Sequence, residues 1–177
     1  MCEVIIYTDG ACSGNGQANN GGAFFSVITA VSKDKVLAAK AVRGVCPNTT
    51  NNRMELLGVV EALKLLKPQG SLNVKVVTDS TYVAKHDPET VKLGMTKAKR
   101  PIKNAELWNE LYRIMSDKGL VVTFEHVDGH AGNFANEYCD AKAALLAAWE
   151  RTTQHSAKVE FKEMTGKDLE NFVAGLN

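Results

Sequence analysis

Four acidic residues stand in distinctive local phrases along the chain. Asp9 ends the apolar run EVIIYT, and Asp79 ends the apolar run LNVKVVT. Glu55 and Asp140 lie instead in stretches with helical character, TTNNRMEL and NEYCDAKA. If the fold brings these four carboxylates together, their mutual repulsion requires several units of positive charge nearby. A pair of divalent cations would supply that charge.

The donor types indicate which cations would bind. Carboxylates with few histidines favour hard, oxygen-seeking ions such as Mg²⁺ or Mn²⁺ over zinc. Two such ions about 3.5–4 Å apart can activate a water molecule and stabilise the leaving oxygen of a phosphodiester. We therefore expect two Mg²⁺ ions per site, with Mn²⁺ as a substitute, and hydrolysis without a covalent intermediate. His126 and His130 have a zinc-like spacing, but the helical H-E-x-x-H context of a zinc site is missing.

Each of these residues also has an ordinary explanation when it is taken alone. Asp9 and Asp79 fit turns or helix caps. Glu55 would favour the dipole of its helix, and Asp140 could be a solvated helix residue. His130, in the glycine-flanked loop VDGHAG, suits a proton shuttle or a product-release gate, although a single loop histidine is more often incidental. The four acids in these phrases together favour one shared site.

The bulk composition is that of an ordinary globular protein. The chain has 177 residues and a mass of 19.2 kDa, with 45% hydrophobic and 23% charged residues, which suits one core that needs no disulfides. It shows neither a signal peptide nor an apolar stretch of the roughly 18 residues that a membrane helix needs. Its four cysteines form no C-x-x-C pair. We expect a cytoplasmic monomer without membrane association.

Positive charge is concentrated in one segment. The whole chain has a net charge of only +1. Residues 92–103, however, contain no acid and five basic residues: Lys92, Lys97, Lys99, Arg100 and Lys103. A basic patch beside an acidic site suits a metal-dependent enzyme that acts on nucleic acid. Charge runs are more often just solvated surface, so this segment decides little alone.

The periodicity of apolar residues predicts an α/β protein. We expect strands at 3–8, 22–31, 36–44, 72–78 and 120–127, and helices at 48–67, 80–86, 104–118 and 135–149. This order gives an antiparallel meander followed by strands that alternate with helices. It predicts a five-stranded mixed sheet, with the later strands parallel and helices packed on both faces.

The chain after about residue 150 has a different character. We expect residues 1–150 to form the catalytic domain and residues 151–177 a C-terminal extension, with a linker from Thr152 to Ser156. Thr165 and Asp168 resemble a capping box. Behind them, apolar residues at helical spacing predict a short amphipathic helix that docks on its own domain or on a partner protein: Leu169, Phe172, Val173 and Leu176.

Five separated phrases identify a family resemblance. YTDGACSGN, TTNNRMEL, VVTDS-x-YV, PIKNAELW and GHAGNFANEYCD resemble the successive motifs of type 1 ribonuclease H, in the same order. The resemblance implies a ribonuclease H-like fold and hydrolysis of the RNA strand of RNA–DNA hybrids, leaving 5′-phosphate and 3′-hydroxyl ends. It also implies removal of RNA primers and R-loops in DNA replication and repair.

The resemblance further implies a set of site residues. It assigns metal binding to four carboxylates and a catalytic role to one loop histidine: Asp9, Glu55, Asp79, Asp140 and His130. Three positions match contacts to the RNA strand, where 2′-hydroxyls distinguish RNA from DNA: Cys12, Asn15 and Asn52. Three others match a pocket for a DNA phosphate: Thr50, Arg53 and Asn104. The basic segment matches a DNA-contacting handle, which includes Lys97, Lys99 and Arg100.

The chain departs from the family pattern in three places. Thr81 replaces a glutamine at another RNA-strand contact, the basic segment is shorter than the fuller bacterial handle and lacks its tryptophans, and the tail has no recognised counterpart. Two other functions are less favoured. A DNA nuclease or resolvase could share the fold, but the complete set of RNA-strand and phosphate-pocket residues argues against it. A catalytically dead binding module would have lost at least one acid, whereas all four are present.

Overall fold

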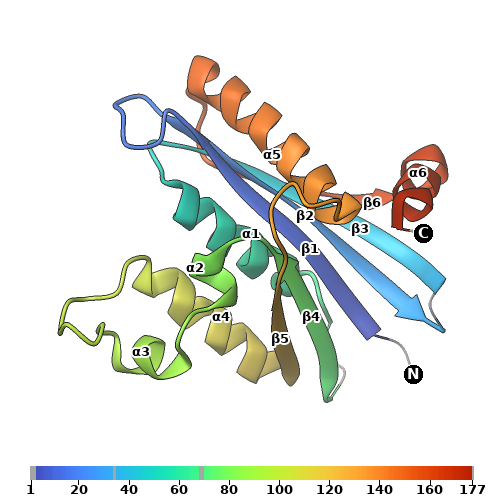
Figure 1. Cartoon of the computed structure of the whole chain (residues 1–177), viewed down its shortest axis with the longest axis horizontal. Helices are drawn as coiled ribbons and strands as arrows, with labels where there is room; N and C mark the ends of the chain where they lie inside the picture. The colour runs from blue at the N-terminus through green and yellow to red at the C-terminus, as the bar shows by residue number, and fades with distance from the viewer. Residues whose placement is uncertain (1–2, 34, 68–69, 177) are drawn as a thin grey trace.

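A mixed β-sheet lies at the centre of the molecule (Figure 1). The computed structural model describes residues 3–33, 35–67 and 70–176, and over these residues the sheet has six strands in the order β5-β4-β1-β2-β3-β6. They are β1 (Glu3–Ser13), β2 (Gly21–Ser32), β3 (Lys35–Pro47), β4 (Leu72–Thr78), β5 (Leu120–His126) and β6 (Lys158–Met164). The first three form an antiparallel meander, and β4 and β5 run parallel to β1. The α/β class and the mixed sheet are confirmed.

The expected number of five strands was one too few, because β6 pairs antiparallel with β3. This strand lies at the edge of the sheet, and its sequence KVEFKEM mixes charged and apolar residues. Phe161 on β6 is 68% exposed, so the burial pattern that marks a central strand is missing. Cross-strand ion pairs join it to its neighbour instead, one of them between Arg43 and Glu160 at 2.9 Å. Such an edge strand leaves little signal in the sequence.

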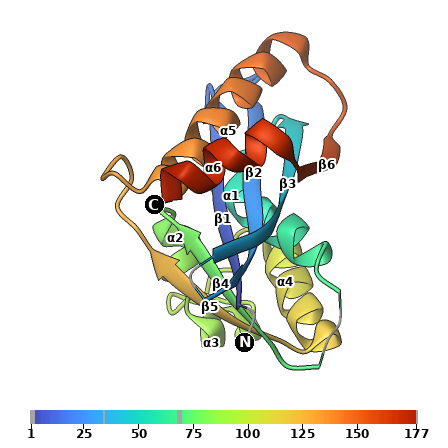
Figure 2. The same cartoon turned by 90° about the vertical axis from the view of Figure 1, so that its right-hand side faces the viewer.

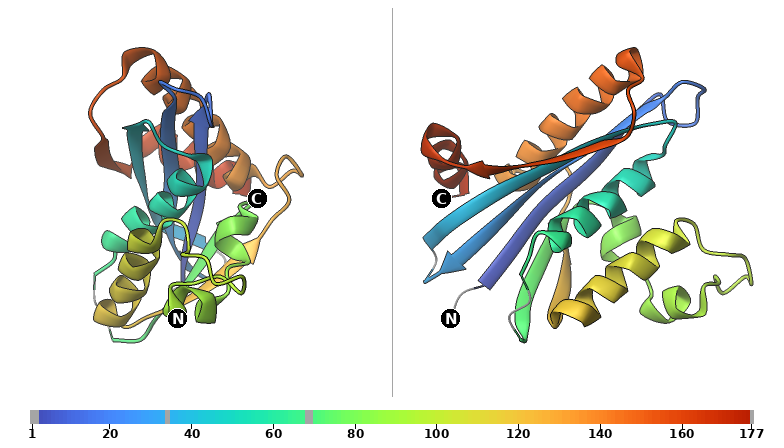
Figure 3. Two further views of the ribbon diagram at one scale, coloured as in Figure 1. Left: turned by 90° about the vertical axis from the view of Figure 1, so that its left-hand side faces the viewer. Right: turned by 180° about the vertical axis from the view of Figure 1, so that it is seen from behind.

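Helices cover both faces of the sheet, as expected. On one face lie α1 (Asn51–Lys64) and α4 (Ala105–Lys118), and on the other lie α5 (Phe134–Thr153) and α6 (Gly166–Leu176) (Figure 2). Two short helices, α2 (Thr81–Ala84) and α3 (Pro88–Leu93), lie in the connection between β4 and α4 (Figure 3). Helix α3 was not expected from the sequence. No helix in the described parts of the chain is long and apolar enough to cross a membrane.

Strand β2 is buried on both sides, and its side chains divide the core in two. Because successive side chains of a strand point to opposite faces, Phe24 and Ile28 pack with α1 and α4. Phe25 and Val27 pack on the other face, with α5 and α6. The sheet is therefore held firmly between two helical layers, and its strand ends are fixed.

The tail helix docks on the same sheet. Phe172 of α6 is completely buried and makes edge-on ring contacts with Tyr7 of β1 and Tyr138 of α5. Helix α5 continues to Thr153, so the connection to β6 is shorter than the expected linker. The division of the chain near residue 150 stays a prediction.

Candidate active site

Glycine at position 10 brings the first two acids together. A Cβ atom on Gly10 would lie 2.3 Å from the backbone nitrogen of Glu55, so no other residue allows α1 to approach β1 this closely. Asp9 directly precedes this contact, and its Oδ1 accepts a hydrogen bond of 2.7 Å from the Gly10 backbone N–H. The Asp-Gly pair therefore places Asp9 beside the start of α1, which carries Glu55.

Asp79 reaches the same place through the parallel pairing of β1 and β4. Tyr7 is the last residue of β1 in register with β4, where its partner is Val77, so Asp9 and Asp79 both follow this paired segment. Asp79 comes directly after the end of β4, whereas β1 continues past Asp9 to Ser13, beyond the expected end at residue 8. Asp140 comes from the opposite face of the sheet, on α5. The thiol of Cys139 contacts the Tyr7 carbonyl oxygen at 3.4 Å and anchors this turn of the helix on β1.

The four predicted carboxylates line one open cavity of about 450 Å³. Asp9 is the most enclosed of them, with 4% of its surface exposed. Burial, followed by the negative charges of Asp79 and Asp140, raises the pKa of Asp9 from 3.8 to about 8. The protonated form of Asp9 is therefore favoured at neutral pH when no cation is bound.

Burial also raises the pKa values of the next two carboxyls. For Asp79 the charge of Asp140 adds to the effect of burial. For Glu55 the rise is opposed by hydrogen bonds from Ser80 Oγ and from Asn51 Nδ2, the latter 2.7 Å long. These two bonds hold the Glu55 carboxylate in a fixed orientation at the cavity wall.

The residues of this cavity fit hard divalent cations. Every acidic side chain that lines it offers oxygen, the donor that Mg²⁺ and Mn²⁺ prefer. Burial, and then the neighbouring carboxylates, raise the pKa values of Asp9 and Asp79, and a bound cation would oppose this rise. Among the described residues, no three acidic, histidine or cysteine side chains are gathered tightly enough to form a ready metal-ligand set.

His130 lies at the mouth of the site on the loop between β5 and α5. Its side chain is 81% exposed, its backbone is left-handed with a φ of 56°, and its Nε2 lies 3.8 Å from Oδ2 of Asp140. The preceding Gly129 lies against Asp79, because a Cβ atom there would be 2.7 Å from Oδ2 of Asp79. The structure thus places the imidazole beside the carboxylates but free to move in solvent.

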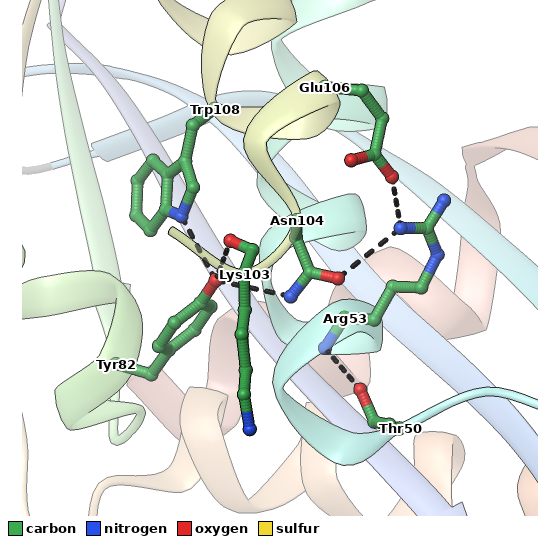
Figure 4. Close-up of polar contacts among 7 residues, drawn as sticks. All are labelled: Thr50, Arg53, Tyr82, Lys103, Asn104, Glu106 and Trp108. Carbon is green, nitrogen blue, oxygen red and sulfur yellow. Dashed lines mark hydrogen bonds and ion pairs between the residues drawn. The ribbon is translucent and has the colours of Figure 1, made fainter. Parts of the chain in front are cut away.

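The predicted phosphate pocket lies at the junction of α1 and α4 (Figure 4). Thr50 caps α1 by accepting a 3.3 Å hydrogen bond from the Arg53 backbone N–H, and the Arg53 guanidinium donates to Asn104 Oδ1 at 3.3 Å. The guanidinium also forms an ion pair with Glu106. Tyr82 supports the pocket, because its hydroxyl accepts from Asn104 Nδ2 at 3.1 Å.

The remaining predicted contacts lie around the cavity on different elements. Cys12 lines it, Asn15 is exposed on the following loop with its Oδ1 3.4 Å from the Asn51 backbone N–H, and Asn52 is exposed on α1. Thr81 is exposed at the start of α2. The basic segment folds into an exposed turn that carries Lys97, Lys99 and Arg100. In this turn the Lys99 backbone N–H donates a 2.8 Å hydrogen bond to the Thr96 carbonyl oxygen.

Three residues that support the carboxylates were not identified from the sequence as functional. Ser80 and Asn51 donate to Glu55, and Gly129 allows the histidine loop to approach Asp79. Ser80 follows Asp79 directly and Asn51 lies one turn before Glu55, so their spacing was visible. Their contacts across elements were not.

Comparison with known proteins agrees with this geometry. Residues 1–148 match the family model described as RNase H. The chain belongs to the RNase H family. It is 42% identical over 149 residues to ribonuclease H of Clostridium botulinum, covering 81% of this chain and 94% of that protein. It is 39% identical over 164 residues to ribonuclease H of Ruegeria sp., covering 89% and 99%.

A solved structure shares the RNase H fold. It is that of LC9-RNase H1, described as a type 1 RNase H with the type 2 active-site motif. The TM-score is 0.69 at 25% sequence identity, and the match covers 98% of this chain and 84% of that one, so it reaches into the C-terminal tail. Membership of the RNase H family makes the chain a hydrolytic nuclease.

Proposed function

We propose that this protein hydrolyses the RNA strand of RNA–DNA hybrids at the carboxylate cavity, leaving 5′-phosphate and 3′-hydroxyl ends. The observation that carries the proposal is the position of Asp9, which is almost fully buried between Asp79 and Asp140 with a pKa raised to about 8. A nuclease site with this surplus of negative charge suits binding of cations and, through them, of a phosphodiester.

Asp9, Glu55, Asp79 and Asp140 would hold two Mg²⁺ ions, or Mn²⁺ ions in their place. When bound, the ions would activate a water molecule and stabilise the leaving oxygen. The protein's own groups have separate tasks. Ser80 and Asn51 orient the Glu55 carboxylate, and the exposed His130 imidazole carries a proton between Asp140 and solvent.

Three surfaces support a hybrid as the substrate. Cys12, which lines the cavity, and the exposed Asn15 and Asn52 would contact the 2′-hydroxyls of the RNA strand, which DNA lacks. Arg53 and Asn104 form a separate polar pocket suited to a phosphate of the paired DNA strand. The exposed basic turn after α3 adds positive charge for the DNA backbone.

In the cell, this activity would remove RNA primers and R-loops during DNA replication and repair. This role requires recognition of hybrids without a fixed base sequence. The contacts proposed above meet this requirement, because phosphates and 2′-hydroxyls are the same at every position.

A panel of labelled duplexes tests the proposed activity. The purified protein should cleave an RNA–DNA hybrid in Mg²⁺, and leave RNA duplex and DNA duplex intact. Asp9→Asn should lose at least about 100-fold in rate, because one cavity carboxylate becomes neutral. Asp117→Asn, which neutralises an exposed acid on α4, is the matched control and should keep full activity. Cleavage of DNA duplex, or an active Asp9→Asn variant, would show the proposal to be wrong.

A further inference from the structure

The last turn of α5 is tied to the loop that follows β1. Arg151 Nη2 donates a 2.8 Å hydrogen bond to Gln17 Oε1 of this loop. Gln154 Nε2 lies 3.3 Å from both the Asn19 and the Asn20 carbonyl oxygens. The same loop carries Asn15, one of the proposed contacts to the RNA strand. Two distant parts of the chain therefore form one surface.

The Arg151 guanidinium lies against a glycine that leaves room for it. A Cβ atom on Gly14 would be 2.8 Å from Cζ and 3.0 Å from Nε of Arg151, and Gly14 has a φ of +74°. At Gly21, a Cβ atom would lie 2.2 Å from the Arg151 backbone nitrogen. Both the side chain and the backbone of Arg151 are thus held against glycines. A basic residue in a last turn also favours the helix dipole, but that effect requires neither glycine nor the bond to Gln17.

Arg151 lies where the carboxylate cavity ends. Cys12 and Ser13 line the cavity, and the guanidinium covers the next residue along the chain, Gly14. Burial raises the pKa of the Cys12 thiol, and the positive charge of Arg151 opposes that rise, which shows that the two groups are close. Along α5, Arg151 lies eleven residues after Asp140, about 16 Å at the rise of an α-helix.

The guanidinium retains most of its hydrogen-bonding capacity. Among the described residues no carboxylate forms an ion pair with it, and Gln17 accepts only one of its five N–H groups. A planar guanidinium with free donors matches the oxygens of a phosphate. Figure 1 shows the last turn of α5 and the loop after β1 at the upper left of the molecule, and the segment between α3 and α4 at the lower left. The basic turn on that segment is thus far from Arg151.

We propose that Arg151 binds a backbone phosphate of the RNA strand, at the end of the cavity far from the basic turn. This inference rests on the proposed function, because it takes the strand that contacts Cys12 and Asn15 to be RNA. The neighbouring Gln17 holds the guanidinium in place. The site would add to hybrid affinity in a chain whose basic segment is short.

Salt dependence of binding distinguishes a phosphate contact from a purely structural role. Hybrid affinity is measured by fluorescence anisotropy in Mg²⁺ at several salt concentrations, with Asp9→Asn as the uncleaving parent. Loss of one phosphate contact lowers the slope of log affinity against log salt by about 0.7–0.9, and we expect Arg151→Ala to do this with a roughly 3- to 10-fold loss of affinity. Arg151→Gln should behave in the same way, and far-ultraviolet circular dichroism and thermal melting check that both variants fold.

The matched control is Lys142→Ala, which removes one positive charge from the same helix at a site far from the loop, where Nζ lies 5.4 Å from the centre of the Tyr138 ring. Its slope should equal that of the parent. An Arg151→Ala variant with weaker binding but an unchanged slope would mean that the residue only positions the loop, and would overturn the inference. Equal slope changes in Arg151→Ala and Lys142→Ala would also overturn the inference, because the loss of any positive charge on α5 would then explain the result.

The strand is tested with neutral methylphosphonate linkages placed one at a time in the hybrid. At one position in the RNA strand, the neutral linkage should weaken hybrid binding by the parent and leave hybrid binding by Arg151→Ala unchanged. If the only such position lies in the DNA strand, the inference is wrong while the proposed function survives. If the parent fails to bind hybrid at all, the proposed function fails as well.

Discussion

Asp9→Asn should stabilise the metal-free protein at alkaline pH even though the proposed function predicts a large loss of activity. Asp9 is buried beside two other carboxylates, and asparagine has nearly the same shape without a charge. The substitution therefore removes a group that the fold holds in an unfavourable environment. The gain should grow with pH, because only the ionised form of Asp9 is disfavoured.

The expected size follows from the pKa of Asp9. Burial and its acidic neighbours raise this pKa from 3.8 to about 8, whereas in the unfolded chain the group titrates near the lower value. The stability contributed by protonated Asp9 is therefore complete below about pH 4 and is lost as the pH rises to about 8. Four pKa units correspond to at most about 6 kcal/mol, and we expect about 2–4 kcal/mol after relaxation of solvent and neighbours.

Urea unfolding in EDTA at pH 5 and pH 8 measures this difference. At each pH, the gain is the free energy of unfolding of Asp9→Asn minus that of the wild type. This gain should be about 2–4 kcal/mol larger at pH 8 than at pH 5. Mg²⁺ should stabilise the wild type more than the variant. Asp117→Asn, at an exposed position on α4, should show no such pH dependence. If the gain in free energy of unfolding from Asp9→Asn is the same at pH 5 and pH 8, the reasoning is refuted.

Three further substitutions probe the core, a buried acid and the phosphate pocket. Phe172→Ala removes the buried anchor of α6 and should lower the free energy of unfolding by about 3–5 kcal/mol in urea titration; a loss below 1 kcal/mol would mean that the tail helix is not docked. Glu150 is fully buried and neither carboxylate oxygen has a hydrogen-bond partner among the described residues, so Glu150→Leu should raise the free energy of unfolding by about 1–3 kcal/mol, and a lower melting temperature would contradict this. Glu106→Gln should tighten hybrid binding roughly threefold in anisotropy titrations, because it frees the Arg53 guanidinium for a phosphate; unchanged affinity would exclude competition by Glu106.

The positions of the acids could be predicted because their signals are local. Asp9 and Asp79 each end an apolar run, and the parallel pairing of β1 with β4 brings these positions together, although β1 itself continues past Asp9 to Ser13. Glu55 and Asp140 could be placed on helices from periodicity, but the distance of those helices from the sheet depends on packing. Gly10 decides this distance for α1, and the requirement becomes visible only when the two backbones are seen in contact.

The remaining features depend on contacts between segments far apart in the sequence. Ser80 donates to Glu55 across 25 positions, and Arg151 donates to Gln17 across 134. No spacing rule connects such residues. Edge strand β6 was missed for a related reason, since it is stabilised by pairing with β3 and cross-strand charges while Phe161 stays exposed. The amphipathic pattern of α6 was clearer because one of its residues, Phe172, is fully buried.

The chemistry of the cut ends tests the central claim most directly. A labelled hybrid is incubated with the protein in Mg²⁺ and in EDTA, and the RNA products are identified by mass spectrometry. Hydrolysis by a metal-activated water at the four carboxylates predicts 5′-phosphate and 3′-hydroxyl ends in Mg²⁺ and no products in EDTA. Products with 2′,3′-cyclic phosphate and 5′-hydroxyl ends, or cleavage that persists in EDTA, would contradict the account.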